Sequence, residues 1–235
     1  MSFTAPASTC PTGALCPTLT YYQPLVQLGT VSTLQNQQGF SRAFNGVELT
    51  GRKRLSNHWL MNASYSYNST IVNYGPGSFV DPTNIAARNG YQYDYATAGS
   101  GIGNVFINAK WLVKVSGMVQ LPLGINASAF YNARQGYPFE QTVTSPTRAN
   151  GAGTANLLVA NVGDVRLPNF QNLDFHVDRA VKFGTVRLVP SLDIFNVANS
   201  GTEQAFRPAQ NSSNANFIQA LVAPRVARFG IKVSW

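Results

Sequence analysis

The strongest constraint on the fold of this chain is a regular alternation of apolar and polar side chains, clearest in the final stretch RVARFGIKVSW. Successive residues of an extended strand point to opposite faces, so every second residue shares a face. One face of residues 225–235 is apolar, and only Val226 is out of phase on the other. Such a strand either meets a second sheet in a soluble sandwich or separates lipid from a wet lumen in a membrane barrel. The apolar face carries Ala227, Phe229, Ile231, Val233 and Trp235.

The same alternation recurs in earlier segments and predicts an all-β, antiparallel fold of about seven strands. Each segment has about the length that crosses a bilayer when tilted. No apolar run approaches the roughly 18 residues of a membrane-spanning helix, which argues against a helical membrane protein. The predicted strands are residues 44–55, 59–70, 111–122, 125–135, 172–183, 186–199 and 225–235.

The connections between these segments alternate strictly between short and long. Strict alternation places every long connection at the same end of the sheet, which is the layout of outer-membrane barrels, with short periplasmic turns and long extracellular loops. Compact soluble domains rarely carry polar loops of this length. The short connections lie around residues 56–58, 122–124 and 184–185, and the long ones at about 71–108, 136–170 and 200–224.

An odd number of strands is the second constraint, because bacterial single-chain barrels have even counts and an open sheet edge cannot lie in lipid. We therefore expect a β-barrel portion: residues 41–235 supply the C-terminal strands of a larger barrel, and residues 1–40 end another extracellular loop. The alternative is that TYYQPLVQLGTV within residues 1–40 supplies an eighth strand. The start, MSFTAPASTC, lacks a secretory signal, so either the protein stays inside the cell or this chain is part of a longer product.

Composition supports a lumen-lined barrel over a cytosolic enzyme. Only 11% of the residues are charged, which is roughly half the usual share, and Asn, Gln, Ser, Thr and Gly fill the deficit. The net charge of +8 is compatible with nucleic-acid binding, but the basic residues are scattered apart from Arg52-Lys53-Arg54. No stacking motif or basic helix accompanies them, so we expect no nucleic-acid partner.

The only cysteines, Cys10 and Cys16, lie in CPTGALC. This spacing, with Pro and Gly between them, suits a small disulfide-closed loop in an oxidising compartment. Two free surface thiols are the alternative. A metal site would need more ligands than this segment offers, because neither histidine lies nearby in sequence.

No group of residues predicts catalysis, a cofactor or a metal. Asp174, His176 and Asp178 share one strand face at two-residue spacing, which resembles a metal or acid–base set. In a barrel strand the same pattern is expected of polar residues lining the lumen, with Arg187 or Lys182 as ion-pair partners. We expect the second role, and no enzymatic activity.

Tyrosines are frequent in the predicted outer loops. An exposed Tyr ring can capture a ligand by stacking or hydrogen bonding, and girdle or loop packing uses the same residue type. These side chains form a candidate ligand-facing loop set: Tyr74, Tyr91, Tyr93, Tyr95 and Tyr137.

Several stretches, in this order and spacing, give the chain a resemblance to a known family. They are FNGVELTGRKRLSNHWLMNASYSYNST, LPLGINASAFYNARQGYPF and LPNFQNLDFHVDRAVKFGTVRLVPSLDIFNVANS, followed by the terminal aromatic. Together they span most of residues 40–235, and they resemble the C-terminal barrel of TonB-dependent outer-membrane receptors, especially the Oar-like group.

The resemblance implies a 22-stranded barrel in the bacterial outer membrane, plugged by an N-terminal domain and energised through TonB. Such receptors import scarce nutrients such as metal chelates, cobalamin or glycans. The chain lacks a plug and a TonB box, so those partners are expected only through a missing N-terminal part. Trp235, with Phe229, resembles the C-terminal signature that the barrel-assembly machinery recognises.

Two other functions remain open on the sequence. One is a self-contained small outer-membrane barrel or adhesin-like structural protein, completed by an eighth strand from residues 1–40. The other is a soluble all-β carbohydrate-binding module, in which the apolar faces form the core of a sandwich.

Overall fold

The computed structural model describes residues 1–27, 29, 41–73, 83, 109–160 and 163–235. The predicted all-β class is confirmed: these residues form antiparallel strands, with 3₁₀ turns only at Ala7–Thr9 and Pro122–Gly124. In the part of the chain that the structure describes, no helix is long and apolar enough to span a membrane.

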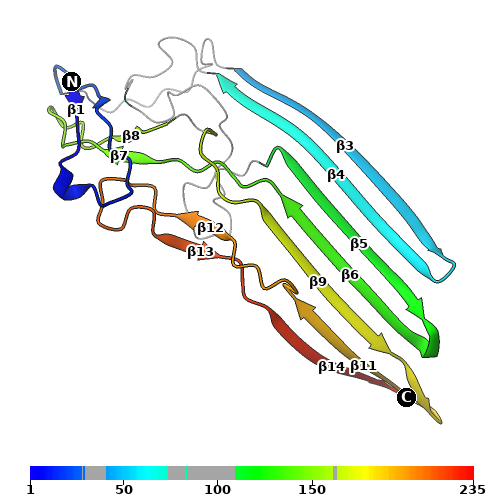
Figure 1. Ribbon diagram of the computed structural model, residues 1–235. Coiled ribbons are helices and arrows are strands. Elements are labelled where there is room, and N and C mark those ends of the chain that lie inside the picture. The colour runs from blue at the N-terminus through cyan, green and yellow to red at the C-terminus, as the bar shows by residue number, and fades with distance from the viewer. Residues whose placement is uncertain (28, 30–40, 74–82, 84–108, 161–162) are drawn as a thin grey trace.

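One large antiparallel sheet contains a strand at each of the seven predicted segments (Figure 1). Its strand order is β3, β4, β5, β6, β9, β11, β14, and β10 continues β9 on the edge of β11 beyond Ala180. The bounds are β3 (Ser41–Ser56), β4 (Trp59–Asn73), β5 (Trp111–Leu121), β6 (Ile125–Arg134), β9 (Phe170–Arg179), β10 (Val181–Phe183), β11 (Val186–Phe195) and β14 (Val226–Ser234).

The register brings the alternation of every strand into phase. Tyr65 on β4 lies opposite Leu49 on one side and Val113 on the other. The next residue, Ser66, likewise lies opposite Glu48. One face of the sheet, called here the apolar face, therefore includes Val47, Leu49, Trp59, Met61, Tyr65, Tyr67, Val113, Val115, Val119, Leu121, Ala127, Tyr131, Leu173, Phe175, Val177, Leu188, Leu192, Phe229, Ile231 and Val233.

The opposite face, called here the polar face, is lined mainly by hydroxyl, amide and charged side chains. Leu60, Met118, Phe130 and Phe195 are apolar exceptions on it. Its polar members include Glu48, Thr50, Arg52, Asn62, Ser64, Lys114, Ser116, Asn126, Ser128, Asn132, Asn172, Asp174, His176, Asp178, Ser191, Asp193 and Arg228.

Local backbone chemistry explains the tight turns at one end of the sheet. Asn57 and His58 join β3 to β4 with φ of 51° and 65°, the left-handed pair that a two-residue hairpin needs. Gly184, with φ of 59°, opens the equivalent turn between β10 and β11. All the long connections leave from the opposite end, and the two chain termini lie at opposite ends of the molecule (Figure 1).

The N-terminal segment and the connections β6–β9 and β11–β14 differ from the predicted polar loops, because their described residues contain short strands and a small core. The paired short strands are β1 (Ser2–Phe3) with β2 (Leu19–Thr20), β7 (Thr142–Thr144) with β8 (Asn156–Leu158), and β12 (Glu203–Phe206) with β13 (Ile218–Leu221). We call residues 1–27, 135–160, 163–169 and 196–225 the loop cap. Strands of two to four residues are too short to give an alternation signal, so the sequence did not predict them.

All but one of the buried apolar residues in the described part of the chain lie in the loop cap and not in the large sheet. Val143, Leu157 and Leu158 are at most 2% exposed. Among the described residues of the large sheet, only Ala133 is a buried apolar residue. The sheet is a single layer, and no other element covers its apolar face in the described part of the chain (Figure 1).

The sheet is open in the part of the chain that the structure describes. Strand β3 pairs only with β4, and β14 pairs only with β11, so one side of each is an unpaired edge. The described residues thus form a curved wall and not a closed barrel.

Gly136 fixes how the loop cap joins the sheet. A Cβ at this position would collide with the carbonyl of Leu167 and lie 2.8 Å from the Pro168 oxygen. The two segments are also tied by hydrogen bonds, from Gly136 N to Asn169 Oδ1 at 3.1 Å and from Arg166 Nη1 to Gly136 O at 3.0 Å.

We expect Gly136→Ala to lower the free energy of unfolding by about 1–3 kcal/mol, because backbone must move to admit the methyl group. Urea unfolding in detergent micelles, followed by tryptophan emission, measures this change. Gly51→Ala is the matched control, since nothing lies within 4 Å of its Cβ. Equal effects of the two substitutions would contradict the close packing at Gly136.

Candidate functional site

The most connected polar cluster lies on the polar face, around His176. The hairpin register places His176 on β9 directly opposite Asp193 on β11. His176 Nδ1 lies 2.7 Å from Asp193 Oδ1, and His176 Nε2 lies 3.1 Å from Asp178 Oδ2. The imidazole is therefore held between two carboxylates, one on its own strand and one on the neighbouring strand.

Arg228 extends this cluster to the next strand. Its Nε and Nη2 atoms each lie 3.0 Å from Asp193 Oδ2, so Asp193 uses both oxygens, one for each neighbouring strand. The predicted ion-pair partners Arg187 and Lys182 are wrong. These two lie opposite each other near the turn, and six residues of extended strand, roughly 20 Å, separate Arg187 from Asp193.

Asp174 lies on the same face, nearer the loop cap, and has hydrogen-bond partners of its own. Its Oδ1 atom accepts hydrogen bonds from Asn172 Nδ2 at 2.8 Å and from the Asn196 backbone N–H at 2.9 Å. The second bond fixes the chain where β11 ends and the loop cap begins. The predicted Asp174, His176 and Asp178 thus share one face; His176 and Asp178 are hydrogen-bonded to each other, and Asp174 has separate partners.

A hollow of 330 Å³ lies beside this cluster on the polar face. Asp174, His176 and Asp193 line one part of it, while Leu60, Met118, Phe130 and Phe195 supply apolar walls. Within the described residues, no three His, Cys, Asp or Glu side chains are grouped so that they could hold a metal ion. The arrangement offers shape and charge for contacts with another surface, and it presents no nucleophile–base pair.

Tyr137 is the only member of the predicted loop tyrosines that can be placed. The Arg134 guanidinium lies 3.7 Å from the centre of its ring and 5.0 Å from that of Phe170, so the three form a cation–π stack where the sheet meets the loop cap. The sequence analysis missed Arg134, which the alternation places on the polar face. A ligand-binding role of Tyr137 stays a prediction. Tyr74, Tyr91, Tyr93 and Tyr95 lie outside the described residues.

The predicted assembly residues lie on or beside the apolar face. Phe229 is opposite Leu192 and is 82% exposed. Trp235 follows the end of β14, at the end of the sheet where the tight turns lie, and is 94% exposed. Both side chains are accessible to a partner, and recognition by the barrel-assembly machinery stays a prediction.

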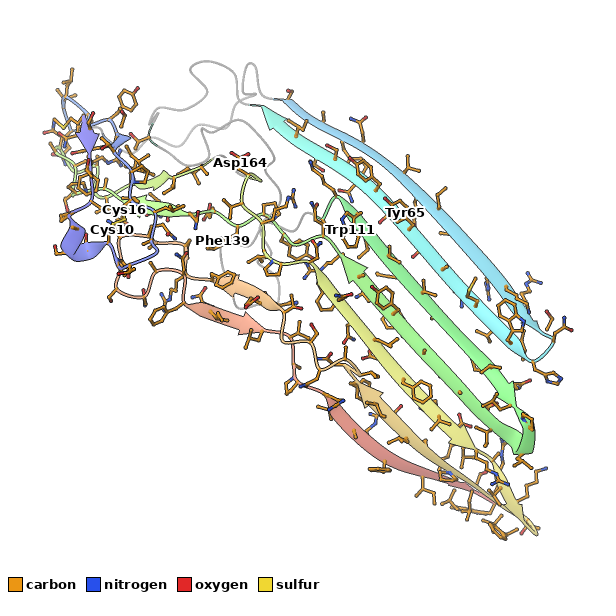
Figure 2. The ribbon with its side chains drawn as sticks, in the orientation of Figure 1. Cys10, Cys16, Tyr65, Trp111, Phe139 and Asp164 are labelled. Carbon is orange, nitrogen blue, oxygen red and sulfur yellow. A yellow bond between two sulfur atoms is a disulfide. The ribbon has the colours of Figure 1, made fainter. Side chains whose placement is uncertain are left out.

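Cys10 and Cys16 form a disulfide in the loop cap, with their Cα atoms 6.5 Å apart (Figure 2). Figure 2 also shows Phe139 in the loop cap, whose ring centre lies 5.6 Å from that of Phe206. The bond between Cys10 and Cys16 closes a short loop, which lowers the conformational entropy of the unfolded chain and so stabilises the folded state by about 2 kcal/mol.

Glu140 is a buried carboxyl group in the loop cap that the sequence analysis did not single out. It is 4% exposed, and its Oε2 atom has no hydrogen-bond partner among the described residues. Burial disfavours the charged form and raises the pKa of Glu140 from 4.5 to about 7. No sequence signal marks this position, because its burial depends on the packing of the loop cap.

The comparison with known proteins leaves the resemblance described above without independent support: no family model and no curated protein sequence matches this chain.

We expect the loop cap to lose stability as pH rises through about 7. A carboxyl whose folded pKa lies above its unfolded pKa stabilises the fold fully below about 4.5, and this contribution disappears as pH rises through the folded pKa. Glu140→Gln should therefore stabilise the loop cap at pH 8 by up to about 3 kcal/mol and change little at pH 5. Hydrogen exchange of loop-cap amides at the two pH values measures the difference. A gain of equal size at both values would contradict the assigned cause.

Proposed function

We propose that this chain forms the C-terminal barrel wall and external loops of an outer-membrane receptor of the TonB-dependent, Oar-like kind. One observation carries the proposal: the described sheet is one layer thick, and the mainly apolar face of it is uncovered in the described part of the chain. The family is proposed from the sequence resemblance. The membrane location is proposed from the uncovered apolar face of the sheet.

The size of the uncovered apolar face favours lipid over water as the surroundings of the sheet. More than a dozen large apolar side chains on this face are exposed, among them Leu49, Phe229 and Ile231. Burying one such side chain is worth roughly 1.5–3 kcal/mol. Neighbouring side chains already cover about half of each one. Leaving the other half in water would therefore cost roughly 10–20 kcal/mol of hydrophobic free energy, which is as large as the net stability of a whole domain. Lipid removes this cost.

The polar face and the strand lengths fit the same role. Strands of 9 to 16 residues in the sheet reach or exceed the roughly 9–11 that a tilted transmembrane strand requires. Hydroxyl, amide and paired charged side chains on the opposite face are those expected beside a water-filled or plugged lumen. The grouping of the long connections at one end supplies an external surface, the loop cap.

The unpaired edges of β3 and β14 support a larger barrel. In lipid every backbone N–H and C=O group needs a partner, so further strands have to pair with both edges. A plug domain and TonB would act through those missing parts. The function proposed is capture of a small ligand or glycan and its gated passage, with no chemical conversion.

The two alternatives need features that the described residues lack. A self-contained small barrel needs β3 and β14 to pair directly or through another strand, and no such pairing occurs among the described strands. A soluble carbohydrate-binding module needs a second layer on the apolar face. The small barrel would gain ground if the chain alone folded into a closed monomer in detergent, and the soluble module would gain ground if the chain folded in water without detergent.

We expect an arginine on the apolar face to block membrane folding and one on the polar face to be tolerated. Val115→Arg, near the middle of β5, should cost about 2–4 kcal/mol of stability in a bilayer, because the charge would lie near the bilayer midplane. The adjacent Ser116→Arg, which points to the other face, is the matched control and should cost far less. Urea titration of the protein in phospholipid vesicles, followed by tryptophan emission, measures both.

An equal cost for the two variants would contradict the lipid orientation. The receptor assignment has its own test: immunoblotting of the native outer membrane with antibodies against the loop cap should detect a protein much larger than 235 residues. A band at the size of this chain alone would favour the self-contained barrel.

A further inference from the structure

The N-terminal segment of the loop cap forms a closed unit of its own. Strands β1 and β2 pair, and Met1 and Tyr21 exchange two backbone hydrogen bonds of 2.8 Å each. Phe3 packs edge-on against Tyr21, which is itself buried. The Cys10–Cys16 disulfide cross-links the far end of this unit. Hydrogen bonds and a covalent bond therefore fix residues 1–21 at both ends.

Residues 1–27, which include this unit, contact at least one described residue in each of the three long connections of the sheet. Tyr22 N donates to Thr83 Oγ1 at 2.8 Å, in the connection between β4 and β5. Arg148 Nη1 donates to Tyr22 O at 3.3 Å and Asn150 Nδ2 donates to Pro24 O at 2.8 Å, both from the connection between β6 and β9. These contacts join positions that are 61 to 126 residues apart in sequence.

The third contact is made next to the disulfide. Leu15 N, one residue before Cys16, donates to Gln210 Oε1 at 3.1 Å, in the connection between β11 and β14. Gln210 is fully buried, and its backbone N donates to Thr142 O at 2.7 Å. Its side-chain amide exchanges hydrogen bonds with Asn216. Through its side chain and its backbone N–H, Gln210 thus joins the disulfide loop, β7 and the turn before β13.

We propose that residues 1–27 act as a disulfide-held clamp that fixes the β6–β9 and β11–β14 connections relative to each other, with a further contact at Thr83. The cross-link restricts the backbone around Leu15, so its N–H stays aligned with Gln210 at little further entropic cost. The clamp does not depend on the membrane role, because its contacts with Arg148, Asn150 and Gln210 lie within the loop cap and its contact with Thr83 lies outside the large sheet. Its oxidised state is the one that presents the external surface in a single arrangement.

Reduction opens the clamp by ordinary thiol–disulfide exchange. A dithiol reductant transfers two electrons and two protons, the Cys10–Cys16 bond becomes two thiols, and the reductant becomes a cyclic disulfide. Leu15 then gains conformational freedom and leaves Gln210, and the contacts of Tyr22 and Pro24 with the next connection weaken in turn.

The accessibility of the chain at Arg148 to a protease shows whether the clamp is closed or open. It is 7% exposed, and its guanidinium bonds to Ala152 O and Gly153 O of its own turn as well as to Tyr22 O of the clamp. Trypsin cleaves after Arg only when the chain around it opens, so cleavage after Arg148 measures release. Arg54, exposed at the other end of the sheet, is an internal control in the same molecule.

The test is limited trypsinolysis of the full chain in detergent micelles, with and without dithiothreitol, and with fragments identified by mass. We expect reduction of the folded wild type to speed cleavage after Arg148 about tenfold and to leave cleavage after Arg54 unchanged. The Cys10→Ser/Cys16→Ser variant should show the fast rate without reductant and no further response to it.

Gln210→Met tests the docking contact while the disulfide stays intact. It keeps the side-chain size but removes the acceptor for Leu15 N, so cleavage after Arg148 should accelerate under oxidising conditions. The proposal is overturned if complete reduction, verified by thiol alkylation, changes the rate after Arg148 by less than about twofold. It is also overturned if both sites accelerate together, because the disulfide would then stabilise the whole chain and not the clamp.

Discussion

The backbone hydrogen-bond register of the large sheet is the constraint on which the rest of the structure depends. Side chains alternate along each strand, so a slip of one residue in any pair would move that strand's apolar set to the opposite face. Here the strands are in phase from Leu49 on β3 to Phe229 on β14, and the register of β3 with β4 shifts only beyond Lys53, next to the turn. The separation into an apolar and a polar face, and with it the membrane proposal, is a consequence of that agreement.

Much of the sheet could be predicted from the sequence because its signals are local. Alternation located the strands, and turn residues such as Gly184 located the hairpins. A two-residue turn even fixes the register: His176 lies eight residues before Gly184 and Asp193 eight after Thr185, so their contact follows from the turn. Arg187 and Lys182, by the same count, lie next to the turn and too far along the strands to pair with Asp193.

The remaining features could not be predicted because they depend on residues far apart in sequence. Arg228 and Asp193 form an ion pair, but the long connection between β11 and β14 separates them in sequence. Burial of Glu140 and Gln210 depends on how the connections pack together, and no periodic pattern encodes that packing. The loop cap therefore looks like polar loop in the sequence, although it holds the buried core of the described structure.

The two unpaired strand edges have a consequence for handling the isolated chain. A row of free backbone N–H and C=O groups is a template on which a strand of another copy can pair. With β3 and β14 both open, each copy has two such templates and can propagate pairing in both directions. Once out of lipid, copies of the chain would add edge to edge into extended assemblies, and the rate of this growth would rise with protein concentration.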